Sequence, residues 1–255
     1  MKRYMVFLCA SAALAAASGA AQAASLTVTD ISGAWTSWAG GTAVAAGTDG
    51  DTAQLRWGIP TRSTKSGYDF TPSSVPLTPA ENTDFDLGTF SHNNFPIASG
   101  TGIDSAALDV SFTFYLGTDS NSLITRTSRF VFDHWETANA AAPCADGGTV
   151  GTGINANGCA DRVRAVTNPS GTETFEVVDG DVTRRYFFAV TGFDMGDAFW
   201  TKENAQNTAT LRARYLLEEE MAPMPAPIPV PAAGWMLVAG LGAFAATGRR
   251  RRDHA

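Results

Sequence analysis

The amino-acid sequence predicts an all-β fold, a single β-sandwich of jelly-roll type, on three observations. Apolar and polar residues alternate with a period of two over many short segments, as in a strand with one buried face. Those segments are rich in β-branched and aromatic residues, and Gly, Asn, Asp and Pro separate them as turns. Helical periodicity is nearly absent from residues 25–218, so two antiparallel sheets packed face to face are expected.

About ten strands are expected in this region. The clearest is residues 107–116, in which every second residue from Leu108 to Phe114 is apolar. The pair Asp179-Gly180 lies between two apolar runs, a pattern that favours a β-hairpin. A long connection containing several prolines is expected after the third strand. The expected strands are residues 26–31, 35–38, 54–58, 86–90, 107–116, 123–135, 162–166, 173–178, 182–193 and 208–217.

The N-terminal residues predict export. Lys2 and Arg3 precede a short apolar run, and the small residues Ala21 and Ala23 then form the A-x-A pattern of a signal-peptidase site. The apolar run is too short to span a bilayer comfortably. Residues 1–23 are therefore expected to be a cleaved signal peptide.

The C-terminal residues predict a membrane-sorting tail. Residues 221–231 are rich in proline, which disrupts helices and sheet ladders and favours an extended linker. Residues 232–248 are apolar, and as a helix they would reach roughly 25 Å, slightly less than a hydrocarbon core of about 30 Å. The tail as a whole, residues 232–255, is thus expected to hold one transmembrane helix. A basic block that should stay on the cytoplasmic side follows the helix, and consists of Arg249, Arg250, Arg251 and Arg252.

The segment Ile228, Pro229, Val230, Pro231 and Ala232, together with the glycine-rich apolar run and the arginines, resembles the VPLPA variant of the PEP-CTERM sorting signal. The resemblance covers about the last thirty residues. It implies that an exosortase-type membrane protease is a partner and processes the tail. The chain would then be exported through the inner membrane as an anchored precursor and reach the cell surface or extracellular space. An ordinary C-terminal anchor is the alternative.

A second resemblance lies in the ectodomain, which is similar to the THxN family of PEP-CTERM proteins and the related choice-of-anchor K domain. The family motif maps onto Ser91, His92, Asn93 and Asn94, with Ser where the family has Thr. The family implies no particular activity. His92 is either a ligand or general base, or part of a hydrogen-bonded turn with Ser91 and Asn94, which we expect. The segments that carry the resemblance are residues 55–58, 66–70 and 87–97.

The ectodomain, residues 24–220, is long enough for one well-buried core, so one domain is expected. Residues 24–231 hold 12 basic and 24 acidic residues, a net charge of −12, which disfavours binding to nucleic acid. The two mature cysteines, Cys144 and Cys159, would enter an oxidising compartment, so a disulfide is expected. A thiol pair for metal or redox chemistry is the alternative.

No catalytic motif stands out. The G-x-S-x-G nucleophile elbow is absent from the sequence, and carboxylates close in sequence are typical of turns. Because His92 and His134 are the only histidines of the ectodomain, a His-rich metal site is not expected. No cofactor is expected, with calcium as the alternative, since Asp49, Asp51 and Asp119 supply oxygen ligands in loops.

Taken together, these features predict an exported, non-enzymatic protein of the cell envelope or extracellular matrix. The first alternative is a carbohydrate-binding module for extracellular polysaccharide, in which tryptophans stack on sugar rings. Core packing is the default role of such tryptophans. A secreted hydrolase is the second alternative. The tryptophans of the ectodomain are Trp35, Trp38, Trp57, Trp135 and Trp200.

Overall fold

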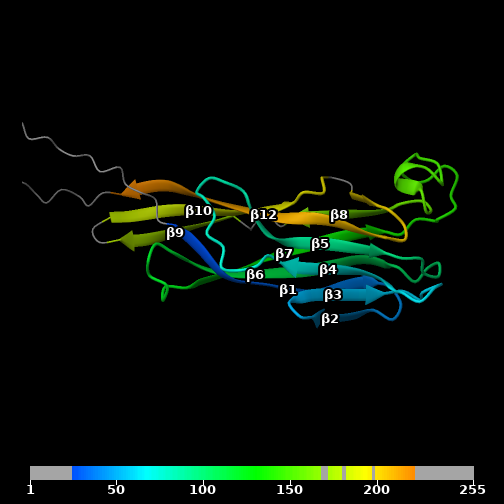
Figure 1. Ribbon diagram of the computed structural model, residues 1–255, viewed down its shortest axis with the longest axis horizontal. Helices are drawn as coiled ribbons and strands as arrows, with labels where there is room; N and C mark the ends of the chain where they lie inside the picture. The colour runs from blue at the N-terminus through cyan, green and yellow to red at the C-terminus, as the bar shows by residue number, and fades with distance from the viewer. Residues whose placement is uncertain (1–24, 168–171, 180–181, 197–198, 222–255) are drawn as a thin grey trace, which may run out of the picture.

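Two antiparallel β-sheets make up the described part of the chain (Figure 1). The computed structural model describes residues 25–167, 172–179, 182–196 and 199–221. Within these ranges there are twelve strands, and the one helical segment is a short 3-10 turn, η1 (Gly153–Asn155). The prediction of an all-β sandwich is therefore confirmed.

The strand order in the two sheets is as follows. The five-stranded sheet runs β1 (Leu26–Gly40), β6 (Ile103–Leu116), β7 (Ile124–Trp135), β8 (Asp161–Thr167) and β11 (Phe199–Thr201). The seven-stranded sheet runs β2 (Ala45–Asp49), β3 (Thr52–Trp57), β4 (Ser66–Pro72), β5 (Phe85–Asn94), β12 (Ala205–Met221), β10 (Val182–Phe193) and β9 (Thr172–Asp179).

The connectivity departs from the predicted jelly roll. Strands β2 to β5 are consecutive neighbours in one sheet, and β6 to β8 are consecutive neighbours in the other. These are meanders joined by hairpins, whereas a jelly roll is built from two Greek keys. The jelly-roll detail is therefore wrong. The predicted hairpin at Asp179-Gly180 is confirmed, since β9 pairs with β10 and Asp179 lies opposite Val182.

Three strands lack the alternating pattern and were not predicted. All residues of β2 are exposed, and β11 has only three residues. In β4, five successive residues are buried, because both faces of this strand are covered. The residues that were predicted to form a long, proline-containing connection thus include a central strand, β4. Conversely, the first two predicted segments form one long strand, β1, which has register shifts along its length.

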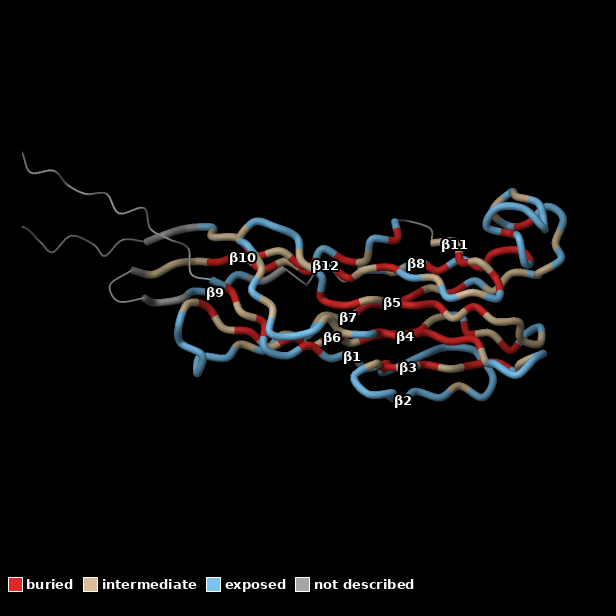
Figure 2. The backbone as a smooth tube through the Cα atoms, in the orientation of Figure 1, coloured by how far each residue is buried: buried red, intermediate tan, exposed pale blue. Residues whose placement is uncertain are grey.

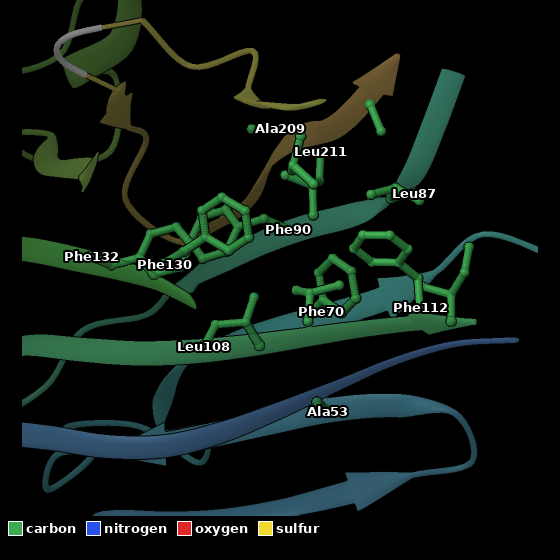
Figure 3. Packing of buried hydrophobic residues seen from close by; sticks show 14 of the residues in the cluster. Ala53, Phe70, Leu87, Phe90, Leu108, Phe112, Phe130, Phe132, Ala209 and Leu211 are labelled. Carbon is green, nitrogen blue, oxygen red and sulfur yellow. The ribbon is translucent and has the colours of Figure 1, made fainter. Parts of the chain in front are cut away.

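Aromatic rings from opposite sheets meet in the core (Figure 3). Phe90 of β5 stacks on Phe132 of β7 with ring centroids 4.7 Å apart, and Phe112 of β6 stacks on Phe188 of β10 at 4.9 Å. Each fully buried ring contributes about 1.5–3 kcal/mol by leaving water, and a stacked pair adds about 0.5–1.5 kcal/mol. The predicted alternation in β6 is confirmed, because its core-facing residues are all buried.

The ring of Phe70, in β4, lies in a narrow slot between two backbones. A Cβ atom added at Gly33 of β1 or at Gly88 of β5 would come within 3.0 Å of that ring. Phe70 is fully buried and has no room to move aside. These two glycines therefore let two strands approach one aromatic side chain closely.

The predicted ends of the chain lie outside the described residues. They comprise the signal peptide 1–23 with Ala21 and Ala23, the linker beyond Met221, and the tail at residues 232–255. Strand β12 extends to Met221, the first residue of the predicted linker. In the part of the chain that is described, no helix is long and apolar enough to cross a membrane.

Candidate functional site

Polar side chains collect inside one end of the sandwich, where core residues would be expected. Buried backbone continues into this region from the middle of both sheets (Figure 2). Burying polar groups is costly unless each is hydrogen-bonded or paired, so such a cluster needs a physical explanation. We call these residues the polar cluster: Tyr68, His92, Asn94, His134, Glu136, Asp161, Thr201 and Glu203.

His92 lies within β5, fully buried, and not in a turn. Its neighbours Ser91 and Asn94 belong to the same strand, which pairs with β4 and β12. The predicted turn is therefore wrong, because polar residues that usually form turns are here ladder residues of a central strand. Alternation along β5 places His92 and Asn94 on one face and Ser91 on the other.

The tautomer of His92 follows from its hydrogen bonds. The Thr201 hydroxyl donates to the carbonyl oxygen of Asp161 at 3.1 Å, so it must accept from Nδ1 of His92 at 2.9 Å. His92 therefore carries its proton on Nδ1, and its buried Nε2 is left without a hydrogen-bond partner. Burial, followed by the effect of His134, lowers the pKa of His92 well below its usual value, so the ring is neutral.

Asn94 is hydrogen-bonded to the same residue as His92, Thr201 of β11. Its amide nitrogen donates to the carbonyl oxygen of Thr201 at 3.2 Å. His92 and Asn94 thus fix β11, which carries Thr201, against β5. This is a positioning role that operates through Thr201.

His134, at the end of β7, is bonded through both ring nitrogens. Its Nδ1 shares a hydrogen with the Tyr68 hydroxyl at 2.7 Å, and its Nε2 faces Glu136 Oε2 at 3.3 Å. The rings of His134 and His92 are nearly perpendicular, with centroids 5.1 Å apart. Trp57 stacks on His92 at 5.9 Å and meets the edge of His134 at 5.4 Å. Aromatic rings therefore fix both imidazoles.

Two acids of the polar cluster are almost completely buried. Asp161 is 0% exposed and Glu203 is 1% exposed. Oδ1 of Asp161 accepts from the backbone N–H of Thr137 at 2.6 Å, and Oε1 of Glu203 accepts from the amide of Asn139 at 3.1 Å. Apart from the contact between these two carboxyls, the second oxygen of each, Oδ2 and Oε2, has no hydrogen-bond partner among the described residues. Asn94 Oδ1 is a third buried oxygen of the polar cluster without a donor among the described residues.

The protonation of these acids is displaced from its ordinary range. Burial, Asp161 and Glu136 raise the pKa of Glu203 to about 8. Burial and Glu136 likewise raise the pKa of Asp161 to about 6. Because the two carboxyls contact one another, Glu203 holds a proton at neutral pH and Asp161 carries the charge.

A surface groove reaches the polar cluster. It has a volume of about 820 Å³, and His134 and Glu136 form part of its wall together with Asp104, Trp135 and Asn139. Small solutes can therefore approach Glu136 from solvent, whereas the side chains of His134, His92, Asp161 and Glu203 are buried behind it.

The predicted disulfide is confirmed. Cys144 and Cys159 are bonded, both are buried, and they close the loop between β7 and β8. That loop contains η1 and projects from one end of the sandwich (Figure 1). It also touches the polar cluster, because the N–H of Thr137 in this loop donates to Oδ1 of Asp161 at 2.6 Å.

The predicted calcium ligands do not come together. Asp49 and Asp51 are exposed at the β2–β3 turn, and the carboxylate of Asp119 accepts from Asn121 and Ser122 in its own turn. Over the described ranges, one group of three or more acidic, histidine or cysteine residues is close enough to hold an ion. It consists of His134, Glu136 and Asp161. The calcium prediction is therefore not supported at Asp49, Asp51 and Asp119.

The tryptophans divide between core and surface. Trp35 and Trp57 are buried, as core packing predicts, but Trp38 is 41% and Trp135 is 46% exposed. Trp135 lies 6.4 Å from Trp200, measured between ring centroids. The guanidinium of Arg162 stands 4.7 Å over the Trp135 ring. An aromatic surface with a cation thus borders the groove.

The fold and the site define a class: a two-sheet antiparallel β-sandwich with a buried polar cluster at the floor of a surface groove. No protein-family profile matches the chain, and no curated protein is significantly similar to it. The resemblances to the THxN family and to the PEP-CTERM tail therefore stay predictions. The tail residues Ile228 to Ala232 and Arg249 to Arg252 lie outside the described part.

Proposed function

We propose that this chain is an exported, non-enzymatic protein of the cell envelope or extracellular matrix, whose sandwich is displayed outside the cytoplasm. The observation that carries the proposal is the buried disulfide between Cys144 and Cys159. Such bonds form and persist in oxidising compartments. The signal-like N-terminus and the sorting-like tail in the sequence support the same direction of transport.

The non-enzymatic part of the proposal rests on where the polar groups lie. Asp161, Glu203 and His92 are completely or almost completely buried, and His92 is engaged in positioning Thr201. A substrate would have to open the core to reach them. Glu136, which faces the groove, is bonded to the buried imidazole of His134, and this pair suits binding better than proton transfer to a substrate.

Mass spectrometry of the protein from its native host tests the proposal. The expected result is a mature N-terminus at Ala24, an oxidised Cys144–Cys159 pair and a C-terminus that lacks Arg249 to Arg252. A variant with Pro229 and Pro231 replaced by Ala is expected to keep its tail. A mature protein with reduced cysteines, found in the cytoplasm, would contradict display. If the surface protein kept Arg249 to Arg252, only the proposed processing by an exosortase would be contradicted.

Carbohydrate binding is a second candidate function, favoured by the pair Trp135–Trp200 at the border of the groove. The exposed ring of Trp135 and the half-buried ring of Trp200 suit stacking on sugars, and the nearby cation Arg162 suits an acidic polysaccharide. The double change Trp135→Ala, Trp200→Ala should abolish retention on the host's extracellular polysaccharide. The change Trp38→Ala is the matched control, since Trp38 is similarly exposed but outside the pair. Equal retention of both variants would dismiss this function.

A further inference from the structure

The residues His134, Glu136 and Asp161 place one imidazole and two carboxylates together from two strands and the loop between them. One ligand atom from each lies within 4.8 Å of the other two. Within this group, Nε2 of His134 and Oε2 of Glu136 are 3.3 Å apart. Metal–ligand bonds of about 2.0–2.2 Å separate neighbouring ligand atoms by about 3–3.5 Å, so small side-chain rotations complete the set.

An independent observation points to a ligand at this place. Asp161 is 0% exposed, its Oδ1 is used by the Thr137 N–H, and its Oδ2 has no partner among the described residues apart from the Glu203 carboxyl. The adjacent Glu203 has an unmatched Oε2 in the same way. A buried carboxylate oxygen without a partner costs free energy that a bound cation removes.

We propose that His134, Glu136 and Asp161 bind a divalent transition-metal ion, with zinc as the representative. One nitrogen and several carboxylate oxygens form the mixed ligand set that suits zinc and its neighbours. Calcium and magnesium take oxygen ligands almost exclusively. The inference is independent of the proposed display and carbohydrate functions.

The surroundings are those of a metal site. The Tyr68 hydroxyl holds Nδ1 of His134 at 2.7 Å and thereby orients Nε2 toward Glu136. The Thr137 N–H fixes the carboxylate of Asp161. Such outer hydrogen bonds orient ligands and increase their affinity for metals. The groove brings solvent to Glu136, whose side chain is 24% exposed, and the buried imidazole of His134 lies directly behind it.

The balance of charges distinguishes the proposed metal site from a network of hydrogen bonds that only stabilises the fold. A proton shared between Asp161 and Glu203 would match their unpaired oxygens, but Glu136 adds a third carboxyl, with an oxygen within 4.8 Å of one of Asp161. No lysine or arginine is a member of the polar cluster. A divalent cation offsets the three acids together, which one proton does not do.

The test uses the full-length chain, purified without a histidine tag and freed of metal by EDTA dialysis. Zn²⁺ titration followed by calorimetry and elemental analysis should show one ion per chain and a rise in Tm. Asp161→Asn should weaken Zn²⁺ binding at least about 100-fold, an effect larger than the 10–100-fold typical of outer-shell changes. Asp133→Asn is the matched control, since it removes the same charge next to His134 but from an exposed side chain paired with Arg164. Wild-type affinity in Asp161→Asn would overturn the proposal.

A second measurement does not depend on the folding of a variant. Co²⁺ added to the metal-free wild-type chain should give visible d–d absorption bands that Zn²⁺ abolishes and that a hundredfold excess of Ca²⁺ does not. Absence of a saturable Co²⁺ spectrum, or its loss with Ca²⁺, would show that the polar cluster is not a transition-metal site. A shared proton between Asp161 and Glu203 would then account for the buried oxygens.

Discussion

The Tyr68 hydroxyl lies 2.7 Å from Nδ1 of His134, although the two residues are 66 positions apart and belong to opposite sheets. Both groups are buried, so the Tyr68 hydroxyl and Nδ1 of His134 satisfy one another's need for a hydrogen-bond partner. This hydrogen bond joins the two layers at the end of the sandwich where the polar cluster lies. It also fixes the buried imidazole of His134 next to Glu136.

Removing that hydroxyl should weaken the fold and the site together. Tyr68→Phe is expected to lower the free energy of unfolding by about 1–3 kcal/mol, because Nδ1 of His134 is left buried and unmatched. Zn²⁺ affinity should fall by about 10–100-fold through the loss of an outer hydrogen bond. Urea denaturation and calorimetry measure the two effects. Tyr115→Phe, on the outer side of β6, serves as the control and should change neither by a measurable amount.

Replacing Glu203 should remove a pH dependence of stability. The pKa of Glu203 is raised to about 8 in the folded state, against about 4.3 in an unfolded chain. The folded protein therefore binds the extra proton between these values, and the stability of the metal-free form falls as pH rises through that window. Glu203→Gln should be more stable than wild type by about 1–3 kcal/mol at pH 8.5 and nearly equal to it at pH 5.

Urea denaturation at several pH values, in EDTA, measures the Glu203→Gln effect. Glu218→Gln is the control, because Glu218 is exposed and should leave the pH dependence unchanged. If the two variants and the wild type lose stability in parallel from pH 5 to 8.5, Glu203 does not retain its proton in the folded protein.

A methyl group at Gly33 or Gly88 should destabilise the core. Either Cβ would press on the buried ring of Phe70, and overpacking of this kind costs about 1–3 kcal/mol. Gly47→Ala, in β2, is the matched control, since nothing lies within 4 Å of its added Cβ. Thermal unfolding of the three alanine variants should separate them. The double variant Phe70→Leu, Gly33→Ala should recover part of the stability that Gly33→Ala loses. If the effects of the two changes on stability were additive, the Gly33 Cβ would not press on the Phe70 ring.

Breaking the disulfide should loosen the β7–β8 loop. Cys144 and Cys159 are 15 residues apart, and closure of a loop of this size stabilises by about 3 kcal/mol. The double change Cys144→Ser, Cys159→Ser should lower the free energy of unfolding by about that amount. Hydrogen exchange should rise first in residues 136–160. Unchanged exchange there would mean that the loop's hydrogen bonds, not the disulfide, hold it.

The sequence predicted the fold better than it predicted the site. Alternation revealed strands such as β6 and β7, where one face is buried and the other exposed. It failed for β4, because a strand covered on both faces has no alternation to detect. The Cys144–Cys159 disulfide could be predicted without a structure, because these are the two cysteines left after the predicted signal peptide is removed.

The polar cluster was harder to predict because its members are remote from one another in the chain. His92 and Thr201 are 109 residues apart, and the contact depends on β5 and β11 meeting at the same end of the sandwich. His92 and Asn94 were identified as notable, but their local composition indicated a turn. A usable signal was the spacing of His134 and Glu136, two residues apart at the end of a strand and hence on one side of it.

The disulfide loop has a consequence for the order of events in the life of the chain. Thr137 and Asn139 lie between β7 and the disulfide and contact Asp161 and Glu203, so the segment that the disulfide holds supplies part of the wall of the polar cluster. In a reducing cytosol the two thiols stay unpaired. If the chain is exported and binds an ion as proposed, the covalent bond that steadies this wall forms only after export. The chain would then acquire its ion outside the cytoplasm and not draw zinc from the interior of the cell.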